Sequence, residues 1–392
     1  MPEKITARYR ITTPMFIGDA AQQASGISPA AVKGALRFWW RALNWGRIRQ
    51  AKDSDSSALQ QLHKEESELF GSAADQGEGQ AKAFIRVKPE NLKYGLPKEQ
   101  PTSGIQYLLG QGLYHFRNGY GRTSAVLSGH IQLEMALKPG VSAAQTQQLV
   151  QAAQALGLLG ALGSRARKGF GSLALESLEC SFASADKLPA VPQNPPELKQ
   201  LLASWSKAFT DSLPPFSAFS TQTRVDVSSI SGNATELQEL AGHEMQLYRS
   251  WGRNGRVSGY PAERNFPNDH DDVLDVSNNI TPQAMPERGV FGLPHNYFFS
   301  SQIPSVKVDI APKEASRNRR ASPLLIHIHR FPNGSHCLVQ LLLPATFLPE
   351  GEKIEFKPKP GRAVDIPFTQ TQINWDTLHQ YLDRFSQRER VL

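Results

Sequence analysis

The sequence has very few cysteines and no long apolar run. Only Cys180 and Cys337 occur among its 392 residues, which excludes a zinc site built on several cysteines and argues against a structural disulfide. No stretch approaches the roughly 18 apolar residues that a membrane-spanning helix needs. The first residues, MPEKITARYRITTP, carry charges where a signal peptide has its apolar core. We therefore expect a cytoplasmic protein without a membrane segment.

An excess of acidic residues is also missing. Residues 1–185 carry 21 Lys and Arg against 14 Asp and Glu, whereas residues 186–392 carry 22 of each sign. The whole net charge of +7 therefore belongs to the first half. A basic half of this kind suits a polyanion such as RNA or DNA, although it is also compatible with simple solubility.

The first half alternates strand and helix patterns. Residues 4–12, 81–89, 130–139 and 172–182 are typical of strands, and residues 28–45 and 142–162 are typical of helices. Residues 49–66 show no sustained period, and we expect a loop there with a short exposed helix. The order strand, helix, strands, helix, strand predicts a ferredoxin-like α+β domain with two helices on one face of an antiparallel sheet.

The second half repeats this theme more weakly. Strands are expected at 218–229, 323–331 and 336–344, and helices at 234–251 and 375–385. Between the halves, residues 186–200 contain four prolines and are typical of a linker. We therefore predict two tandem ferredoxin-like (RRM-like) domains with long inserted loops, at residues 1–185 and 216–392, joined by a Pro-rich linker at 186–215.

One predicted helix carries a basic ridge. At about 100° per residue, Lys33, Arg37 and Arg41 stack on one face, separate from the apolar stripe. Cations one turn apart can meet successive phosphates, and Trp40 beside them can stack on a base, since Trp39 already faces the core. The alternative is a solvated face of an amphipathic helix.

The stretch LGSRARKGFGSL (162–173) concentrates three glycines and three cations between a predicted helix and a predicted strand. A Walker-type phosphate loop is excluded, because that loop precedes a helix. The cations could oppose the negative end of the preceding helix. They could instead contact a sugar-phosphate chain that a glycine-rich backbone approaches closely. The residues concerned are Arg165, Arg167, Lys168, Gly169 and Phe170.

No catalytic or metal-binding set emerges. His327 and His329 share one strand face, but no carboxylate in the pattern completes a metal site. The acidic stretch NDHDD (268–272) lacks EF-hand spacing, and we interpret it as a polar turn. Residues 27–50 and 157–175 contain no histidine that could act as a general base. We predict no cofactor, no metal and no catalytic residue.

Several of these blocks together resemble a known family. TPMFIGDA (13–20), ISPAAVKGALRFWWRAL (27–43), ESELFGS (66–72), GYG (119–121) and LGSRARKGFGSL are similar to the RAMP proteins of CRISPR systems. Within that family they resemble the first RAMP subunits of type III-B (Cmr) effector complexes. The later blocks GVFGLPH (289–295) and RNRRASPLLIHIHRF (317–331) resemble the second half of those subunits.

The resemblance implies a function and further site residues. It implies a non-catalytic RNA-binding subunit that holds the 3′ region of the guide RNA, helps to engage single-stranded target RNA, and contacts other RAMP subunits. A metal-independent RAMP endoribonuclease that processes guide RNA is the alternative. The glycine-rich loop and the basic helix would contact RNA. Two clusters in the second half would join them, unless they are merely solvated: Arg249, Arg253 and Arg256, and Arg317, Arg319 and Arg320.

Overall fold

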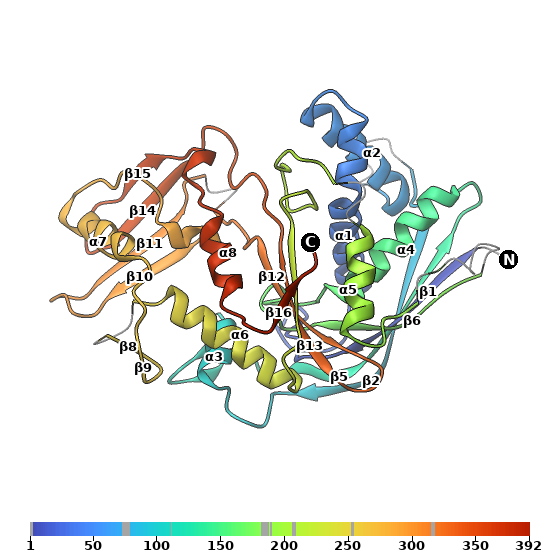
Figure 1. Ribbon diagram of the computed structural model, residues 1–392, viewed down its shortest axis with the longest axis horizontal. Coiled ribbons are helices and arrows are strands. Elements are labelled where there is room, and N and C mark those ends of the chain that lie inside the picture. Colours follow the sequence, from blue (N-terminus) through green and yellow to red (C-terminus); the bar gives the residue numbers. More distant parts are fainter. Residues whose placement is uncertain are drawn as a thin grey trace.

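The computed structural model of the protein describes residues 3–72, 79–110, 112–181, 188, 190–205, 209–251, 255–314 and 318–392. Three four-stranded sheets dominate these residues. Figure 1 shows the first sheet at the right, the second in the middle and the third at the left. None of the helices within the described ranges is long and apolar enough to cross a membrane.

The first sheet has the ferredoxin-like strand order. Its antiparallel strands follow the order β2-β5-β1-β6, and β1 alternates buried and half-exposed residues as its sequence predicts. The helices α1 and α4 pack against each other and begin at the capping serines Ser28 and Ser142. The elements are β1 (Lys4–Ile11), α1 (Pro29–Gln50), β2 (Ala83–Gly95), β5 (Ala125–Leu137), α4 (Ala143–Leu158) and β6 (Leu173–Cys180).

The second sheet repeats this arrangement. Its order, β12-β13-β7-β16, places its four strands as the first sheet places its own, and α6 packs on β12 and β13. The prediction of two tandem ferredoxin-like units with antiparallel sheets is therefore confirmed. The elements are β7 (Arg224–Ser228), α6 (Ala234–Arg249), β12 (Leu324–Arg330), β13 (His336–Leu342), α8 (Asp376–Asp383) and β16 (Arg388–Arg390).

The third sheet consists of two insertions into the second unit. One strand pair lies between α6 and β12 in the chain, the other lies between β13 and α8, and the antiparallel pairing of β11 with β14 joins them. The sequence pattern did not predict this sheet, because its two halves lie more than forty residues apart in the chain. Its strands are β10 (His295–Phe299), β11 (Val306–Pro312), β14 (Lys353–Lys359) and β15 (Val364–Pro367).

The expectation of a loop with a short exposed helix at residues 49–66 was wrong in part, because the helix there is long and partly buried. The helix α2 (Asp55–Phe70) begins at a capping box on Ser54 and packs against α1. Its buried residues include Leu62, Leu69 and Phe70, but the polar residues between them weaken the helical period. The remaining short elements are α3 (Ser103–Leu109), β3 (Tyr114–His115), β4 (Gly119–Tyr120), β8 (Arg256–Val257), β9 (Tyr260–Pro261), α7 (Pro267–Asp275), η4 (Val276–Asn278), η5 (Glu287–Phe291) and η7 (Gln370–Gln372).

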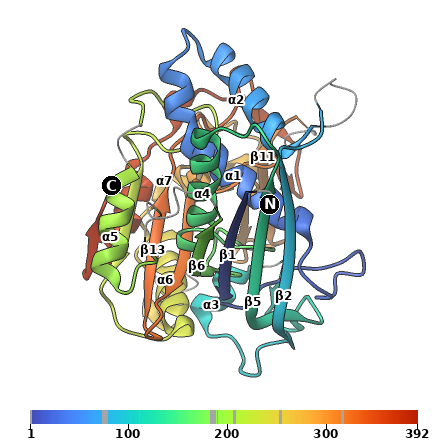
Figure 2. The same ribbon diagram turned by 90° about the vertical axis from the view of Figure 1, so that its right-hand side faces the viewer.

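The segment predicted as a linker contains a helix. The helix α5 (Pro195–Ala203) begins at the capping residue Asn194, and Figure 2 shows it beside β13. Leu198 and Leu202 are fully buried in an apolar cluster that also contains residues of both units. The boundary at 186–215 stays a prediction, since residues 182–187, 189 and 206–208 lie outside the described part of the chain.

The two units share one apolar core. On one face of β12, Ile326 and Ile328 pack in a cluster with the residues of α6. On the other face, Leu325 belongs to the cluster that contains Trp39 of α1 and Leu156 of α4. The second sheet is therefore covered on both faces, and we expect the units to unfold together rather than separately.

Two histidines lie in this shared region. His327 and His329 of β12 are 1% and 0% exposed, and their rings lie 5.8 Å apart. Burial lowers the pKa of His329 to about 3, and it lowers the pKa of His327 well below its ordinary value. The nearby imidazoles add to both shifts: His336 acts on His329, and His329 acts on His327.

These histidines predict a loss of stability in mild acid. The unfolded chain takes up protons near pH 6.5, whereas the folded chain does not, so stability is full above that pH and falls as the pH drops below it. Between pH 7.5 and 5.5 we expect about 1.3 kcal/mol of loss per histidine. Urea unfolding at the two pH values measures it. The variant His327→Leu/His329→Leu should lose about 2.5 kcal/mol less than the unaltered protein over this range; an identical loss in both would contradict the prediction.

Candidate nucleic-acid interface

The glycine-rich loop, residues 163–172, joins α4 to β6 at the junction of the two units. Its backbone runs beside β12, which is an edge strand of the second sheet. The amide of Ile326 donates to the carbonyl of Arg167 at 3.1 Å, and the amide of Ile328 donates to the Ser172 hydroxyl at 3.2 Å. The loop thus provides hydrogen-bond acceptors for an edge that otherwise lacks them.

The glycines of the loop are required by close packing. Gly171 has φ +65°, and a Cβ there would lie 2.0 Å from the carbonyl oxygen of Leu162. Gly163 has φ +90°, and a Cβ there would lie 2.8 Å from the carbonyl oxygen of Phe16. Both conformations favour glycine. The glycines therefore serve the fit between loop and core, not an approach to phosphate.

Two residues predicted to contact RNA are instead buried in this fit. The carbonyl of Gly169 accepts hydrogen bonds from Thr13 Oγ1 and Gln238 Nε2, each at 2.8 Å. Phe170 is 2% exposed and packs edge-on against Phe16. Neither the Gly169 backbone nor the Phe170 ring is available to a nucleotide, because the contact between the two units occupies them.

The cations of the loop meet cations from the second unit. We call Arg165, Arg167, Lys168, Arg249, Arg319 and Arg320 the junction cluster. Arg165 is exposed. Partial desolvation and the charge of Arg319 lower its pKa, and burial and the charge of Arg320 lower the pKa of Arg167. The cluster joins three sequence segments that were predicted separately, from both halves of the chain.

No carboxylate neutralises the junction cluster among the described residues. Burial lowers the pKa of Arg167 to about 10, and the charge of Arg320 adds to the shift. Burial lowers the pKa of Arg320 to about 10 as well. For Lys168, burial is again the largest cause, and neighbouring guanidinium groups take its pKa to about 7. Those groups belong to Arg249, Arg165 and Arg167.

Some cluster members also have a structural role. Arg167 donates to the carbonyl of Ser322, and its guanidinium lies 5.4 Å from the ring of Phe38 on α1. The Arg249 guanidinium lies 4.4 Å from the ring of Phe291 and 5.9 Å from that of Tyr107. The Nε atom of Arg249 is buried without a hydrogen-bond partner among the described residues. An anion at the cluster would supply such a partner.

A cavity of about 850 Å³ adjoins the cluster at Arg249. It is lined by aromatic side chains together with cations. The Trp251 ring stacks on His270 with centroids 4.7 Å apart, the Arg264 guanidinium lies 5.5 Å from the Trp251 ring, and Phe298 is 68% exposed. Cations next to aromatic faces are the arrangement that single-stranded nucleic acids favour.

An acidic residue holds one wall of this cavity. Asp269 is 5% exposed, and its carboxylate accepts from the amides of Glu287 and Arg288 at 2.7 and 3.0 Å. It also accepts from the Arg288 guanidinium at 3.1 Å. Burial and the charges of Arg249 and Arg288 lower the pKa of His295, so its imidazole stays neutral. The stretch NDHDD thus belongs to α7 and not to a polar turn, and it positions Arg288.

The basic ridge of α1 mainly faces another helix. Arg37 Nε and Arg41 Nη1 both donate to Glu66 Oε1 of α2, at 2.6 and 2.5 Å, and Glu66 is 3% exposed. The sequence pattern did not predict this, because only a short exposed helix was expected within residues 49–66. Arg37 and Arg41 are therefore held in ion pairs with Glu66 of α2, which occupy part of each guanidinium group.

Trp40 corrects a second expectation about α1. Both Trp39 and Trp40 are buried, at 2% and 0% exposure, although the period placed only one of them in the core. Trp39 packs against Phe219, which lies between α5 and β7 in the chain, and Trp40 packs against Phe70 of α2. Trp40 cannot stack on a base, since α1 is covered on more than one side.

The remaining predicted residues divide into three groups. Arg256 is exposed beside the cavity, and its Nη1 donates to the carbonyl of Gly259 at 2.6 Å. Lys33 lines a separate cavity between α1 and α2. Arg253 and Arg317 lie outside the described residues. In the described part of the chain, no group of three or more His, Cys, Asp and Glu side chains could hold a metal ion.

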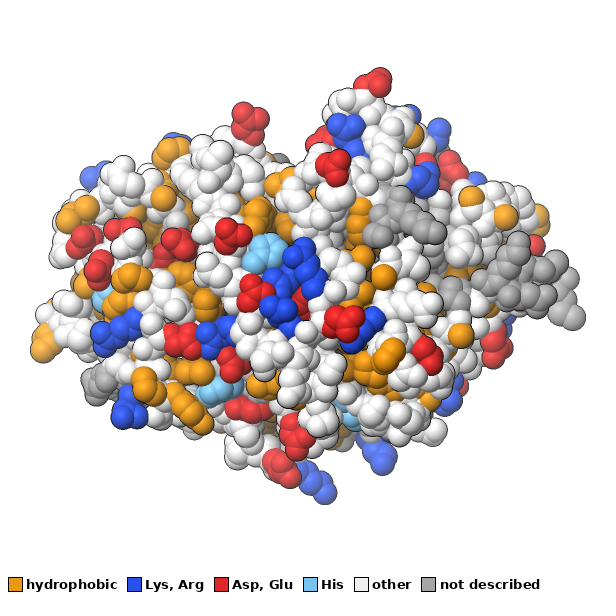
Figure 3. All heavy atoms as spheres, viewed as in Figure 1, with side chains coloured by type: hydrophobic (Ala, Val, Ile, Leu, Met, Phe, Trp, Pro, Cys, Tyr) orange, Lys and Arg blue, Asp and Glu red, His pale blue; other side chains and the backbone are white. Residues whose placement is uncertain are grey.

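Many cations elsewhere in the described part of the chain are paired with acids. Figure 3 shows Lys and Arg beside acidic side chains at the centre of its face. In the second unit, Arg224 contacts Asp226 and Asp383 at 2.7 Å. Cations of the first sheet form ion pairs as well, for example Arg10 with Glu176 at 2.6 Å. The junction cluster differs from these pairs, because several cations lie close to one another there, and it is therefore the candidate interface.

Sequence reasoning missed several residues of the interface. Tyr107 on α3, Arg264, Arg288 and His295 line the cavity but lie in segments without a recognisable period. For His295 alone among these four, the sequence offered a signal, because this residue ends the block GVFGLPH that resembles the family. The others reach the site only because α3 packs on α6 and because the third sheet folds beside it.

Comparison with known proteins confirms the resemblance. Residues 8–174 match the RAMP superfamily. The CRISPR system Cmr subunit Cmr1-2 of Pyrococcus furiosus is 26% identical over 182 residues, which are 42% of this chain and 91% of that protein.

Two solved structures share the fold over nearly the whole chain. Apo Cmr1 from Pyrococcus furiosus has a TM-score of 0.57 at 17% identity, covering 99% of this chain and 98% of that one. A chain of the type III-B Cmr-β complex, bound to cognate target RNA and AMPPnP in the presence of ssDNA, has a TM-score of 0.51 at 12% identity, covering 98% and 99%. The likeness extends to the second unit, beyond the residues that the superfamily match covers.

The packing of Gly171 predicts a large effect of a single methyl group. Gly171→Ala should lower the free energy of unfolding by about 1–3 kcal/mol more than Gly140→Ala. Both glycines have positive φ, at +65° and +87°, but a Cβ at Gly140 meets nothing within 4 Å, so the control reports only the backbone strain. Urea unfolding of both variants measures the difference. Equal losses would show that the loop has room to move.

Proposed function

We propose that this protein is a non-catalytic RNA-binding subunit of a type III-B CRISPR ribonucleoprotein effector complex. The similarity of part of the chain to a Cmr subunit supports this proposal, as does the fold that it shares with Cmr1 along nearly its whole length. In this role it would hold the 3′ region of the guide RNA, help to engage single-stranded target RNA and contact other RAMP subunits.

The junction cluster carries the proposal. Six cations from both units converge there without a carboxylate partner among the described residues. Bringing like charges together while partly burying them costs free energy, and the phosphates of an RNA strand would offset that cost. The adjoining cavity, with Trp251 and Phe298 at its wall, would receive a base splayed from the strand.

The same geometry argues for binding without cleavage. A general acid or base works best with a pKa near the operating pH, and burial lowers the pKa of His295, which lines the adjoining cavity, well below its ordinary value. In the alternative, a metal-independent endoribonuclease, Lys168 would be the member of the cluster suited to proton transfer, because its pKa is about 7. We propose instead that Lys168 binds phosphate.

Removing two exposed cations should weaken RNA binding and reduce its dependence on salt concentration. The variant Arg165→Ala/Arg319→Ala is expected to reduce the slope of log affinity against log salt by about 1.4 for single-stranded RNA, if each arginine contacts one phosphate. Its thermal midpoint should stay unchanged, because both side chains are exposed. Fluorescence anisotropy at several salt concentrations measures the slope.

The control for this variant is Arg47→Ala/Lys82→Ala. It removes the same charge from cations that pair with Glu65 and Glu68, away from the junction. An equal loss of slope in both variants would mean that net charge, and not the junction cluster, determines binding.

Lys168 predicts a pH dependence of RNA affinity. A neighbouring phosphate raises the pKa of Lys168 from about 7 in the free protein, so binding takes up a proton when the free amine is neutral. Affinity should therefore be full well below pH 7 and, if the bound amine stays protonated, fall about 25-fold as the pH rises from 6.5 to 8.5. Binding titrations at fixed ionic strength measure this change.

Lys168→Arg is the matched control, because arginine stays charged over this range. Its affinity should be nearly constant with pH. The same samples on a denaturing gel should contain intact RNA. A pH dependence retained in Lys168→Arg would exclude Lys168 as its source, and cleavage abolished by Lys168→Ala would favour the endoribonuclease.

A further inference from the structure

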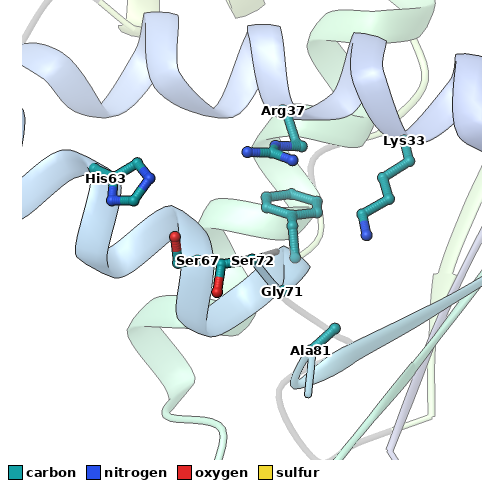
Figure 4. A pocket seen from close by; sticks show the side chains of 8 residues that line it. Lys33, Arg37, His63, Ser67, Gly71, Ser72 and Ala81 are labelled. Carbon is teal, nitrogen blue, oxygen red and sulfur yellow. The ribbon is translucent and has the colours of Figure 1, made fainter. Parts of the chain in front are cut away.

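A second cationic cavity lies between α1 and α2 of the first unit. It measures about 390 Å³ and is lined by Lys33, Arg37, His63, Ser67 and Ser72, with Phe70, Gly71 and Ala81 completing its wall. Figure 4 shows Lys33 and Arg37 reaching into it from α1, and Ser67, Ser72 and His63 on the facing side.

The cavity has an excess of positive charge. Arg37 and Arg41 share the single carboxylate of Glu66, so two guanidinium groups meet one acid. Lys33 lies one turn before Arg37 and takes part in no ion pair among the described residues. No carboxylate lines the cavity within the described ranges. A small anion would therefore be attracted there.

A buried hydroxyl group gives an independent indication of a ligand. Ser67 is 1% exposed, and its Oγ has no hydrogen-bond partner among the described residues. An unpaired buried polar group costs free energy, because it loses its hydrogen bonds to water and gains none in return. The cations nearby are also favoured by the carboxyl end of α2, but that interaction leaves the Ser67 hydroxyl without a partner.

We propose that this cavity binds a phosphate monoester or free phosphate. Lys33 would contribute a point charge, Arg37 the guanidinium donors that Glu66 leaves free, and Ser67 a hydroxyl donor. Donors of these three kinds match the several acceptor oxygens of a phosphate dianion. The site is distinct from the junction cluster and does not depend on the proposed function.

Isothermal titration calorimetry of the full chain tests the proposal. The probes are inorganic phosphate, a 5′-phosphorylated trinucleotide and the same trinucleotide with a 5′-hydroxyl. We expect saturable binding of a phosphorylated probe, weakened at least tenfold by Lys33→Ala and about threefold by Ser67→Ala, and retained in Lys33→Arg. Since Ser67→Ala removes an unpaired buried group, it should not lower the thermal midpoint of the free protein.

The probes and controls separate the outcomes. Binding of inorganic phosphate identifies free phosphate as a ligand, and binding of the phosphorylated trinucleotide alone identifies a nucleic-acid end. Arg47→Ala, which removes a cation that pairs with Glu65, should bind the phosphorylated probes as the unaltered protein does. Absence of binding to both phosphorylated probes, equal binding of the 5′-hydroxyl trinucleotide, or unchanged affinity in Lys33→Ala would each overturn the proposal.

Discussion

The contact between the glycine-rich loop and the edge of β12 is the constraint on which the rest of the structure depends. It satisfies backbone amides of Ile326 and Ile328 that an edge strand would leave open. It also closes an apolar core that residues of both units share. Because the loop fits so closely, its glycines cannot carry side chains, and the two ferredoxin-like units are held in one relative position.

This fixed position brings the cations together. Arg165, Arg167 and Lys168 belong to the loop itself. The contact between the loop and β12 places them close to Arg249, Arg319 and Arg320 of the second unit. The lowered pKa of Lys168 is a direct consequence, since burial and like charges both disfavour its protonated form. The residues of the candidate RNA interface thus either hold the two units together or are direct neighbours of residues that do.

The basic ridge of α1 shows how one sequence feature can serve two purposes. Its periodicity was correctly predicted, but Arg37 and Arg41 neutralise the buried Glu66 of α2. An unpaired Glu66 would be costly in that position. Lys33, on the same ridge but beyond the reach of Glu66, is left at a cavity together with an unsatisfied serine hydroxyl. Equal spacing in the helix therefore gives unequal roles.

The sequence by itself determined the two ferredoxin-like units, the basic loop and the resemblance to RAMP proteins, because strand alternation, helix caps and short motifs depend on neighbouring residues. Only the tertiary structure decided which cations face each other, that Trp40 and Phe170 are buried, and that β11 pairs with β14 across more than forty residues. Those outcomes depend on contacts between distant segments. A periodic pattern specifies which face of an element is apolar, but it does not specify which element covers that face.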